Sequence, residues 1–313
     1  MHGYFRQDYL PVPDGARLYF QVQGEQNPPV VLCDGLGCDG FIWKYLQPEL
    51  RRDHRVLRWH YRGHGKSTVP VDRERIGMVH TTEDLDRLMA HVGMGRSVIV
   101  GHSMGVQVAL EFHRRYPQKV AGLVLICGSY GNPLDTFHDD TLLRRVFPFL
   151  RQTVERFPEL SRKLVKLALS TELAVRLGVL ELNRELVRRK DMIPYFDHLA
   201  NMDPVVFVRT LHALSEHSGW EHLPHINVPT LIIGGDRDTF TPLWLSRRMA
   251  DTIPGAELMI VPGGSHTTPL EQPSLVNERI ARFLQQKILG PSAVEASEDG
   301  SARQNPEEPA QVA

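Results

Sequence analysis

A serine between two glycines offers the clearest chemistry in this chain. The motif reads Gly101-His102-Ser103-Met104-Gly105, and it follows the apolar run Ser97–Val100. Glycines on both sides let the backbone turn sharply from a strand into a helix, which leaves the serine hydroxyl projecting above the edge of a sheet. We therefore predict that Ser103 is a nucleophile.

A serine hydroxyl is a weak nucleophile that needs a general base, and the base needs an acid to orient it. The run Thr230–Ile233 leads into a loop with two acids, Asp236 and Asp238, and the run Leu258–Val261 leads into a loop with His266. Loops that follow strand ends form the ligand sites of open α/β sheets. His266 is the predicted base, and at this stage either acid could orient it.

Strands and helices that alternate along the chain must position these loops. Short apolar runs occupy Val30–Cys33, Val56–Trp59, Ser97–Val100, Val120–Cys127, Thr230–Ile233 and Leu258–Val261. Helical patterns occupy Thr82–His91, Met104–Tyr116, Pro242–Ile253 and Pro273–Leu284. Apolar strands alternating with amphipathic helices predict an α/β fold with a mainly parallel central sheet flanked by helices.

The alternation is interrupted once, between residues 133 and 220. This segment shows helical spacing of apolar residues and no convincing strand, and residues 141–190 hold 12 Lys and Arg against 5 Glu. We predict a core formed by residues 1–132 and 221–289, with a helical insertion at 133–220. Residues 290–313 contain five acids, one arginine and no aromatic residue, which predicts a disordered tail.

Together these motifs resemble the α/β-hydrolase superfamily over about residues 5–288. The segment Arg62-Gly63-His64-Gly65-Lys66-Ser67 resembles the family's R-G-x-G-x-S loop, and Gly235 to Pro242 resembles its G-x-x-D…P segment. His266, followed by Glu271 and Pro273, resembles the G-x-H…E-x-P ending. The resemblance implies a catalytic triad of Ser103, Asp238 and His266, with Asp238 preferred over Asp236. It also implies a helical cap over the site and neither a cofactor nor a metal.

The resemblance further implies an oxyanion hole made of two backbone N–H groups, those of Leu36 and Met104. Family members usually have His-Gly where this chain has Asp34-Gly35. The carboxylate of Asp34 would oppose an oxyanion if it faced the hole. Alternatively, it would accept hydrogen bonds from the N–H groups of its glycine-rich loop and hold that loop in place. We expect the second arrangement.

Composition excludes several classes of protein. The chain has 313 residues, of which 42% are hydrophobic and 23% charged, as in an ordinary globular protein. Its net charge of −1 gives no positive electrostatic field that would attract nucleic acid, so a nucleic-acid-binding protein is not expected. Three cysteines without metal-ligand spacing, together with the lack of a signal-peptide pattern and of a long apolar run, lead us to expect a soluble cytoplasmic protein.

These features predict a serine hydrolase that cleaves a small carboxylic ester through an acyl-enzyme intermediate, as a carboxylesterase or an acylglycerol lipase does. Two kinds of alternative stay open. An acyltransferase, a lactonase or a carbon–carbon bond hydrolase would use the same triad. A non-catalytic binding module with the same fold would have no use for the triad, and the presence of all three residues disfavours it. Ser103 disfavours the family's haloalkane and epoxide branches, whose nucleophile is an aspartate. The insertion should line an apolar acyl site, and its basic surface is either merely solvated or makes weak contact with a membrane surface.

Overall fold

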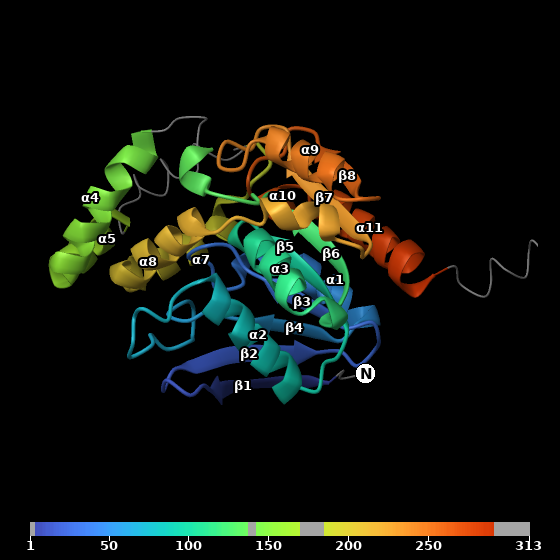
Figure 1. The fold of residues 1–313 in the computed structure, drawn as a ribbon, viewed down its shortest axis with the longest axis horizontal. Coiled ribbons are helices and arrows are strands. Elements are labelled where there is room, and N and C mark those ends of the chain that lie inside the picture. Colours follow the sequence, from blue (N-terminus) through green and yellow to red (C-terminus); the bar gives the residue numbers. More distant parts are fainter. Residues whose placement is uncertain (1–3, 137–141, 170–184, 291–313) are drawn as a thin grey trace, which may run out of the picture.

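One sheet of eight strands forms the centre of the protein (Figure 1). The computed structural model describes residues 4–136, 142–169 and 185–290, so the expected disordered tail lies outside the described residues except for Gly290. The strands are β1 (Phe5–Pro11), β2 (Arg17–Gln23), β3 (Val30–Cys33), β4 (Val56–Trp59), β5 (Ser97–His102), β6 (Val120–Ile126), β7 (Thr230–Gly235) and β8 (Glu257–Val261). Their order in the sheet is β1-β2-β4-β3-β5-β6-β7-β8. The pairs β1–β2 and β2–β4 are antiparallel and all the others are parallel, as the sequence predicts.

The register of the central strands explains why both faces of the sheet are apolar. Val30 pairs with Val56 on one side and Val98 on the other, and the next residue of each strand is again apolar. Because successive side chains point to opposite faces, each face receives its own row of aliphatic side chains. Both rows are fully buried, so helices must cover both faces.

Different helices cover the two faces. One face packs against α2 (Met78–His91), α3 (Met104–Arg115) and α9 (Leu243–Thr252), and the other packs against α1 (Leu46–Asp53), α10 (Thr268–Glu271) and α11 (Pro273–Phe283). Short 3₁₀-helices lie at Phe41–Trp43, Pro117–Lys119, Pro133–Asp135 and Trp220–His225, and a π-helical turn at Leu284–Leu289 follows α11. The fold is therefore a three-layer arrangement with the strand ends free to carry loops.

Four longer helices lie between β6 and β7, in the segment where the sequence predicts an insertion. They are α4 (Leu142–Arg156), α5 (Pro158–Leu169), α7 (Arg189–Asn201) and α8 (Pro204–Glu216). Figure 1 shows them together on one side of the sheet, with α4 and α5 outermost. The described part of 133–220 contains no strand. A small apolar cluster that includes Phe147, Val154 and Val205 joins α4 to α8.

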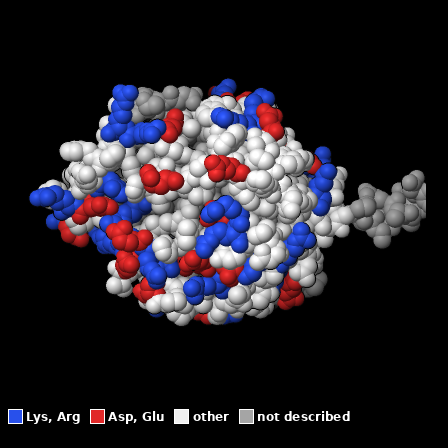
Figure 2. Space-filling model, viewed as in Figure 1, with Lys and Arg blue, Asp and Glu red and all other residues white. Residues whose placement is uncertain are grey.

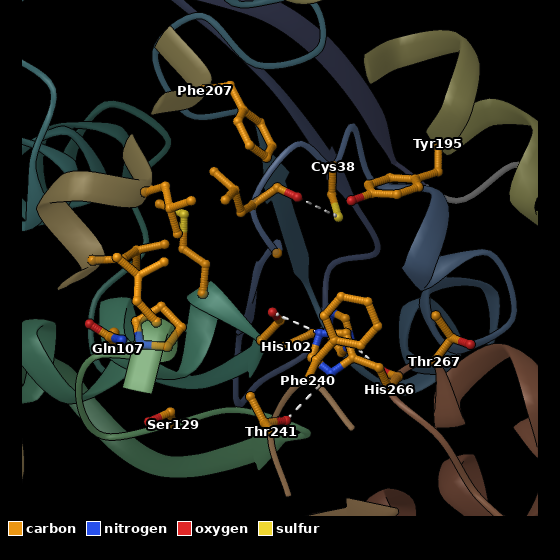
Figure 3. A pocket seen from close by; sticks show the side chains of 18 of the residues that line it. Cys38, His102, Gln107, Ser129, Tyr195, Phe207, Phe240, Thr241, His266 and Thr267 are labelled. Carbon is orange, nitrogen blue, oxygen red and sulfur yellow. Dashed lines mark hydrogen bonds between the residues drawn. The ribbon is translucent and has the colours of Figure 1, made fainter. Parts of the chain in front are cut away.

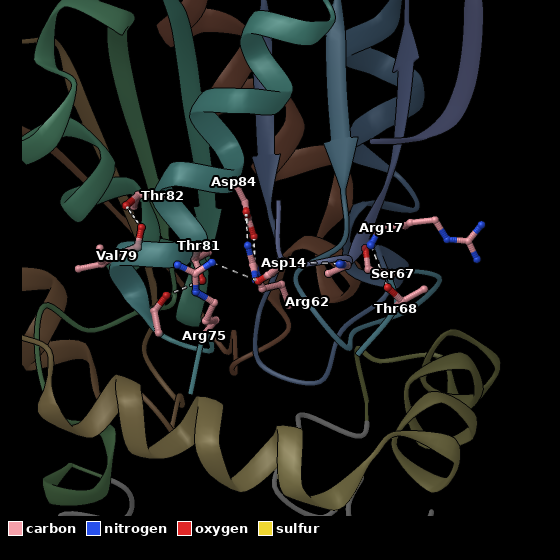
Figure 4. A network of polar contacts seen from close by, with 12 residues as sticks. Asp14, Arg17, Arg62, Ser67, Thr68, Arg75, Val79, Thr81, Thr82 and Asp84 are labelled. Atoms are coloured by element: carbon pink, nitrogen blue, oxygen red, sulfur yellow. Dashed lines mark hydrogen bonds and ion pairs between the residues drawn. The ribbon is translucent and has the colours of Figure 1, made fainter. Parts of the chain in front are cut away.

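Arg62 fastens the loop after β4 to the rest of the fold (Figure 4). Its guanidinium donates two hydrogen bonds to Asp84 of α2, at 2.6 and 2.8 Å, and also pairs with Asp14. All three side chains are largely shielded from solvent. Further along the loop, Ser67 accepts a hydrogen bond from the backbone N–H of Tyr19 and donates one to the carbonyl of His60. The conspicuous motif at 62–67 therefore holds structure together and does not reach the site described below.

Candidate active site

Ser103 lies at the junction between β5 and α3 in a strained backbone conformation, with φ 55° and ψ −115°. Such a conformation persists only where the surroundings enforce it, and it is typical of functional sites. The flanking glycines allow the close packing: a Cβ on Gly101 would lie 2.2 Å from the carbonyl oxygen of Gly105, and one on Gly105 would lie 2.0 Å from that of Cys33. The sequence motif is thus explained by steric need at both glycines.

The three side chains of the predicted triad meet beside this turn, and Figure 3 shows one of them, His266, between Thr241 and Thr267 at the cavity. His266 Nε2 lies 2.9 Å from Ser103 Oγ. Its other ring nitrogen, Nδ1, lies 3.0 and 3.2 Å from the two carboxylate oxygens of Asp238. With Nδ1 protonated toward the carboxylate, Nε2 is left as an acceptor for the hydroxyl proton of the serine.

Asp238, and not Asp236, contacts the histidine. Asp236 is exposed to solvent, whereas the side chain of Asp238 is fully buried. Asp238 accepts hydrogen bonds from the backbone N–H groups of Phe240 and Thr241 and from the hydroxyl of Thr241, at 2.7–2.9 Å. Burial alone would raise the pKa of Asp238, but His266 and the hydrogen bonds from Thr241 outweigh it, so the pKa lies below its usual value. The carboxylate is therefore ionised beside the imidazole.

Two backbone N–H groups are available where the sequence predicts an oxyanion hole. Leu36 and Met104 both line the same cavity as Ser103. Within the residues that the structure describes, neither N–H donates a hydrogen bond to another group of the protein. Met104 begins α3, so its N–H also stands at the positive end of the helix dipole. The pair can stabilise negative charge that develops on a carbonyl oxygen next to Ser103.

A cavity of about 370 Å³ opens above Ser103, large enough for a small organic molecule. The insertion and the loop after β3 supply most of its apolar lining, namely Phe41, Leu143, Met192, Tyr195, Phe196, Phe207, Leu211 and Leu214. Because helices α4, α7 and α8 contribute seven of these side chains, the insertion shapes the space in which a substrate would lie.

One side of this cavity is polar. Gln107 lies one helical turn after Ser103 on α3, and its amide is fixed at both ends. Its Nε2 donates to the carbonyl of Gly131 at 2.7 Å, and its Oε1 lies 2.8 Å from Nδ1 of His217. Ser129 lines the cavity nearby. Sequence reasoning missed both residues, although the spacing of four from the nucleophile could have indicated Gln107.

A profile of the alpha/beta hydrolase fold matches residues 28–273 of the chain. The chain belongs to the alpha/beta hydrolase fold family.

Three similar proteins illustrate the range of this family. A solved esterase from Thermogutta terrifontis is 26% identical, with a TM-score of 0.68, over 89% of this chain and 98% of that one. The dihydrolipoyllysine-residue acetyltransferase component of the acetoin cleaving system of Pseudomonas putida is 27% identical over 86% of this chain and 67% of that protein. The enol-lactonase from Burkholderia xenovorans LB400 has a TM-score of 0.70 and 22% identity, over 88% and 99% of the two chains, and shows the fold alone.

Asp34 occupies the position where members of this family usually have histidine, and our expectation for it was wrong. Within the described residues, neither carboxyl oxygen has a partner at full hydrogen-bond geometry, and the donors that lie near enough to lower its pKa are the Trp43 side chain and the backbone N–H of Gly40. Asp34 therefore does not bind the N–H groups of Gly35, Leu36 or Gly37. It does not line the cavity either. The side chain points instead into the face of the sheet that α1 and α11 cover, beside Trp43 and Arg58, and burial raises its pKa to about 7.

His60, His64, His102, Cys33 and Cys38 are buried, and all five are neutral near pH 7. Burial lowers the pKa of His60 and His102 to about 3 and that of His64 to about 4. Burial raises the pKa of Cys33 to about 12 and that of Cys38 well above its usual value. No cluster of three or more His, Cys, Asp or Glu side chains in the described ranges is arranged to hold a metal ion.

Proposed function

We propose that this protein is a serine hydrolase that cleaves carboxylic esters with an apolar acyl group. The observation that carries the proposal is the continuous chain of contacts from Ser103 Oγ through the His266 ring to Asp238. Two free backbone donors and an apolar cavity lie on the reactive side of this chain of contacts. The similarity to the Thermogutta terrifontis esterase also supports the proposal.

In the first half of the proposed reaction, Ser103 Oγ attacks the ester carbonyl carbon while Nε2 of His266 takes the hydroxyl proton. The carbonyl oxygen becomes an oxyanion that the N–H groups of Leu36 and Met104 stabilise, each by a few kcal/mol. The carbon–oxygen bond of the ester then breaks, and His266 gives its proton to the departing alcohol. The acyl group remains on Ser103.

In the second half, a water molecule attacks the acyl-enzyme and His266 takes its proton. The same two N–H groups stabilise the second oxyanion, and the acyl–serine bond breaks as His266 returns the proton to Ser103. Asp238 stays ionised throughout and stabilises the positive imidazolium in both halves. The products are a carboxylic acid and an alcohol, and no cofactor takes part.

The proposed preference for an apolar acyl group follows from the lining of the cavity. Aromatic and aliphatic side chains of α7, α8 and the turn Phe41–Trp43 surround the space above Ser103. Each methylene group moved from water into such a lining contributes roughly 0.8 kcal/mol. Activity should therefore rise from acetate to longer linear esters until the cavity is filled.

Covalent labelling with a fluorophosphonate probe tests the nucleophile. The wild-type protein should be labelled, and Ser103→Ala should not be. Ser129→Ala is the matched control, because Ser129 lines the same cavity but lies away from His266. Labelling of Ser103→Ala at the wild-type rate would reject the assignment, and a wild-type protein that is never labelled would favour a non-catalytic binding module.

Product analysis separates hydrolysis from the other reactions of the same triad. The p-nitrophenyl esters of increasing chain length should release free acid in water. If added alcohols or amines captured most of the acyl group at low concentration, an acyltransferase would replace the esterase proposal. Lactones are tested as competing substrates in the same assay, and their hydrolysis in preference to the linear esters would favour a lactonase.

A further inference from the structure

Helices α4 and α5 each expose a row of apolar side chains. On α4 the row consists of Val146, Phe149 and Leu150, and on α5 it consists of Leu160, Leu164 and Leu167, with Phe157 between the two helices. Phe149 is 75% exposed and Leu167 is 68% exposed. Exposed apolar residues at single positions are normal, but six of them on two consecutive helices, with a seventh at the junction, mark an interaction surface.

These rows are distinct from the faces that pack on the protein. In α4 the inward face carries Phe147 and Val154, which are buried in the small apolar cluster against α8. The outward residues Val146, Phe149 and Leu150 follow the i, i+3, i+4 spacing of a second apolar stripe. In α5 the spacing of Leu160, Leu164 and Leu167 is the same kind of stripe. Neither row contains a buried residue.

Basic side chains accompany both rows. Residues 142–169 hold seven Lys and Arg and two Glu, in a chain whose net charge is −1. The two glutamates already pair with Arg209 and Arg162. Among the described residues, Arg145, Arg156 and Lys163 have no acidic partner. Figure 2 shows Lys and Arg side chains, with Asp and Glu side chains among them, at the end of the molecule formed by α4 and α5.

We propose that the outer faces of α4 and α5 bind the surface of an anionic lipid bilayer. Helices that combine an apolar stripe with flanking Lys and Arg lie in the plane of the membrane interface, where the apolar side chains enter the boundary region and the charges meet anionic headgroups. None of the described helices has the length and hydropathy to cross a membrane. The proposed contact is one with the surface of the bilayer.

A second copy of the chain fits this surface less well. In a symmetric dimer the same patch would face itself, so Arg145, Arg156 and Lys163 of each copy would approach like charges. An anionic bilayer satisfies both properties of the patch at once.

Vesicle co-sedimentation of the full chain tests the proposal. The protein should sediment with vesicles of phosphatidylcholine mixed with phosphatidylglycerol at low salt, and less with pure phosphatidylcholine. Binding should weaken as salt approaches about 0.15 M, where charges are screened beyond about 8 Å. A Phe149→Trp variant should show a blue-shifted emission when anionic vesicles are added.

Two double variants test the two halves of the patch. Phe149→Gln with Leu167→Gln removes the most exposed apolar side chains, and Arg145→Glu with Lys163→Glu reverses the charge beside them. Each should reduce partitioning to anionic vesicles by at least about tenfold. The matched controls are Val71→Gln, at a residue that is 87% exposed, and Arg51→Glu with Arg247→Glu on α1 and α9. Both controls should bind like wild type, and all variants should hydrolyse a short water-soluble ester equally well.

Several results would overturn this proposal and leave the proposed hydrolase activity standing. The first is a wild-type protein that stays in the supernatant with anionic vesicles at low salt. The second is patch variants that bind as well as the controls do. The third is a dimer in solution that Phe149→Gln with Leu167→Gln dissociates, because the patch would then be covered by a second copy.

Discussion

His102, the residue before Ser103, donates a hydrogen bond from Nε2 to the backbone carbonyl of His266 over 2.8 Å. The carbonyl can only accept, so the proton must be on Nε2 of His102. The rings of the two histidines lie 5.1 Å apart. The turn that carries Ser103 is therefore linked directly to the loop that carries His266, and we expect His102 to act as a positioning residue for the proposed base.

Replacing His102 should disturb the base more than it disturbs the binding of substrate. We expect His102→Ala to lower kcat on a short ester by about tenfold to a hundredfold with little change in KM, because the base loses its fixed distance to Ser103. His102→Gln, whose amide can still donate to the carbonyl, should recover part of the loss. Equal kcat values for the alanine variant and wild type would contradict this role.

The two candidate acids should differ sharply when each is neutralised. Asp238→Asn should lower kcat by roughly 10⁴, because the amide no longer stabilises the imidazolium or fixes the ring tautomer. Asp236→Asn is the matched control, and it should change kcat less than about twofold because Asp236 is exposed and does not contact His266. Steady-state kinetics on one p-nitrophenyl ester, with circular dichroism to verify folding, measure both. If Asp236→Asn were the slower variant, the assignment of Asp238 as the acid of the triad would be wrong.

Local patterns in the sequence were sufficient for the parallel strands β3 to β8, the turn at Ser103 and the loop of His266, whereas the preference for Asp238 over Asp236 came from the resemblance to the family. Apolar runs and glycines act within a few residues, so they can be recognised without the fold. Gln107 and Asp34 show what such patterns do not contain. The partner of Gln107 is His217, which lies 110 residues away, and the direction of Asp34 depends on Trp43 and Arg58 packing beneath β3. The exposed apolar stripe on α4 could not be predicted either, because the spacing of apolar residues does not show which face of a helix is covered by the rest of the protein.

Arg62 should be important for stability rather than for catalysis. Arg62→Ala leaves two shielded carboxylates, Asp14 and Asp84, without their cation, which typically costs about 3–5 kcal/mol of unfolding free energy. Arg282→Ala is the comparison, because its pair with Glu278 is exposed and should be worth at most about 0.5 kcal/mol. Urea unfolding of both variants measures the difference. Equal midpoints would show that the buried pair contributes no more than the exposed one.

Asp34 should make the protein less stable as the pH rises. Its pKa in the folded protein is about 7, against an ordinary value of 3.8. Between these values the folded protein keeps a proton that the unfolded chain has released, so the unfolding free energy falls as the pH increases through this window. Asp34→Asn cannot ionise, and it should therefore gain stability relative to wild type from pH 5 to pH 8, by on the order of 2 kcal/mol.

Thermal or urea unfolding at several pH values measures this gain, and Asp236→Asn, at an exposed carboxylate, is the control that should show none. Because Asp34 lies outside the cavity, Asp34→Asn should change kcat less than about threefold at pH 8. A large increase in kcat would mean that the charge of Asp34 reaches the oxyanion site after all. If the stability of Asp34→Asn changed with pH in the same way as that of wild type does, the pKa of Asp34 would not be raised in the folded protein. The attraction of Arg58 would then offset the cost of burying the ionised carboxylate.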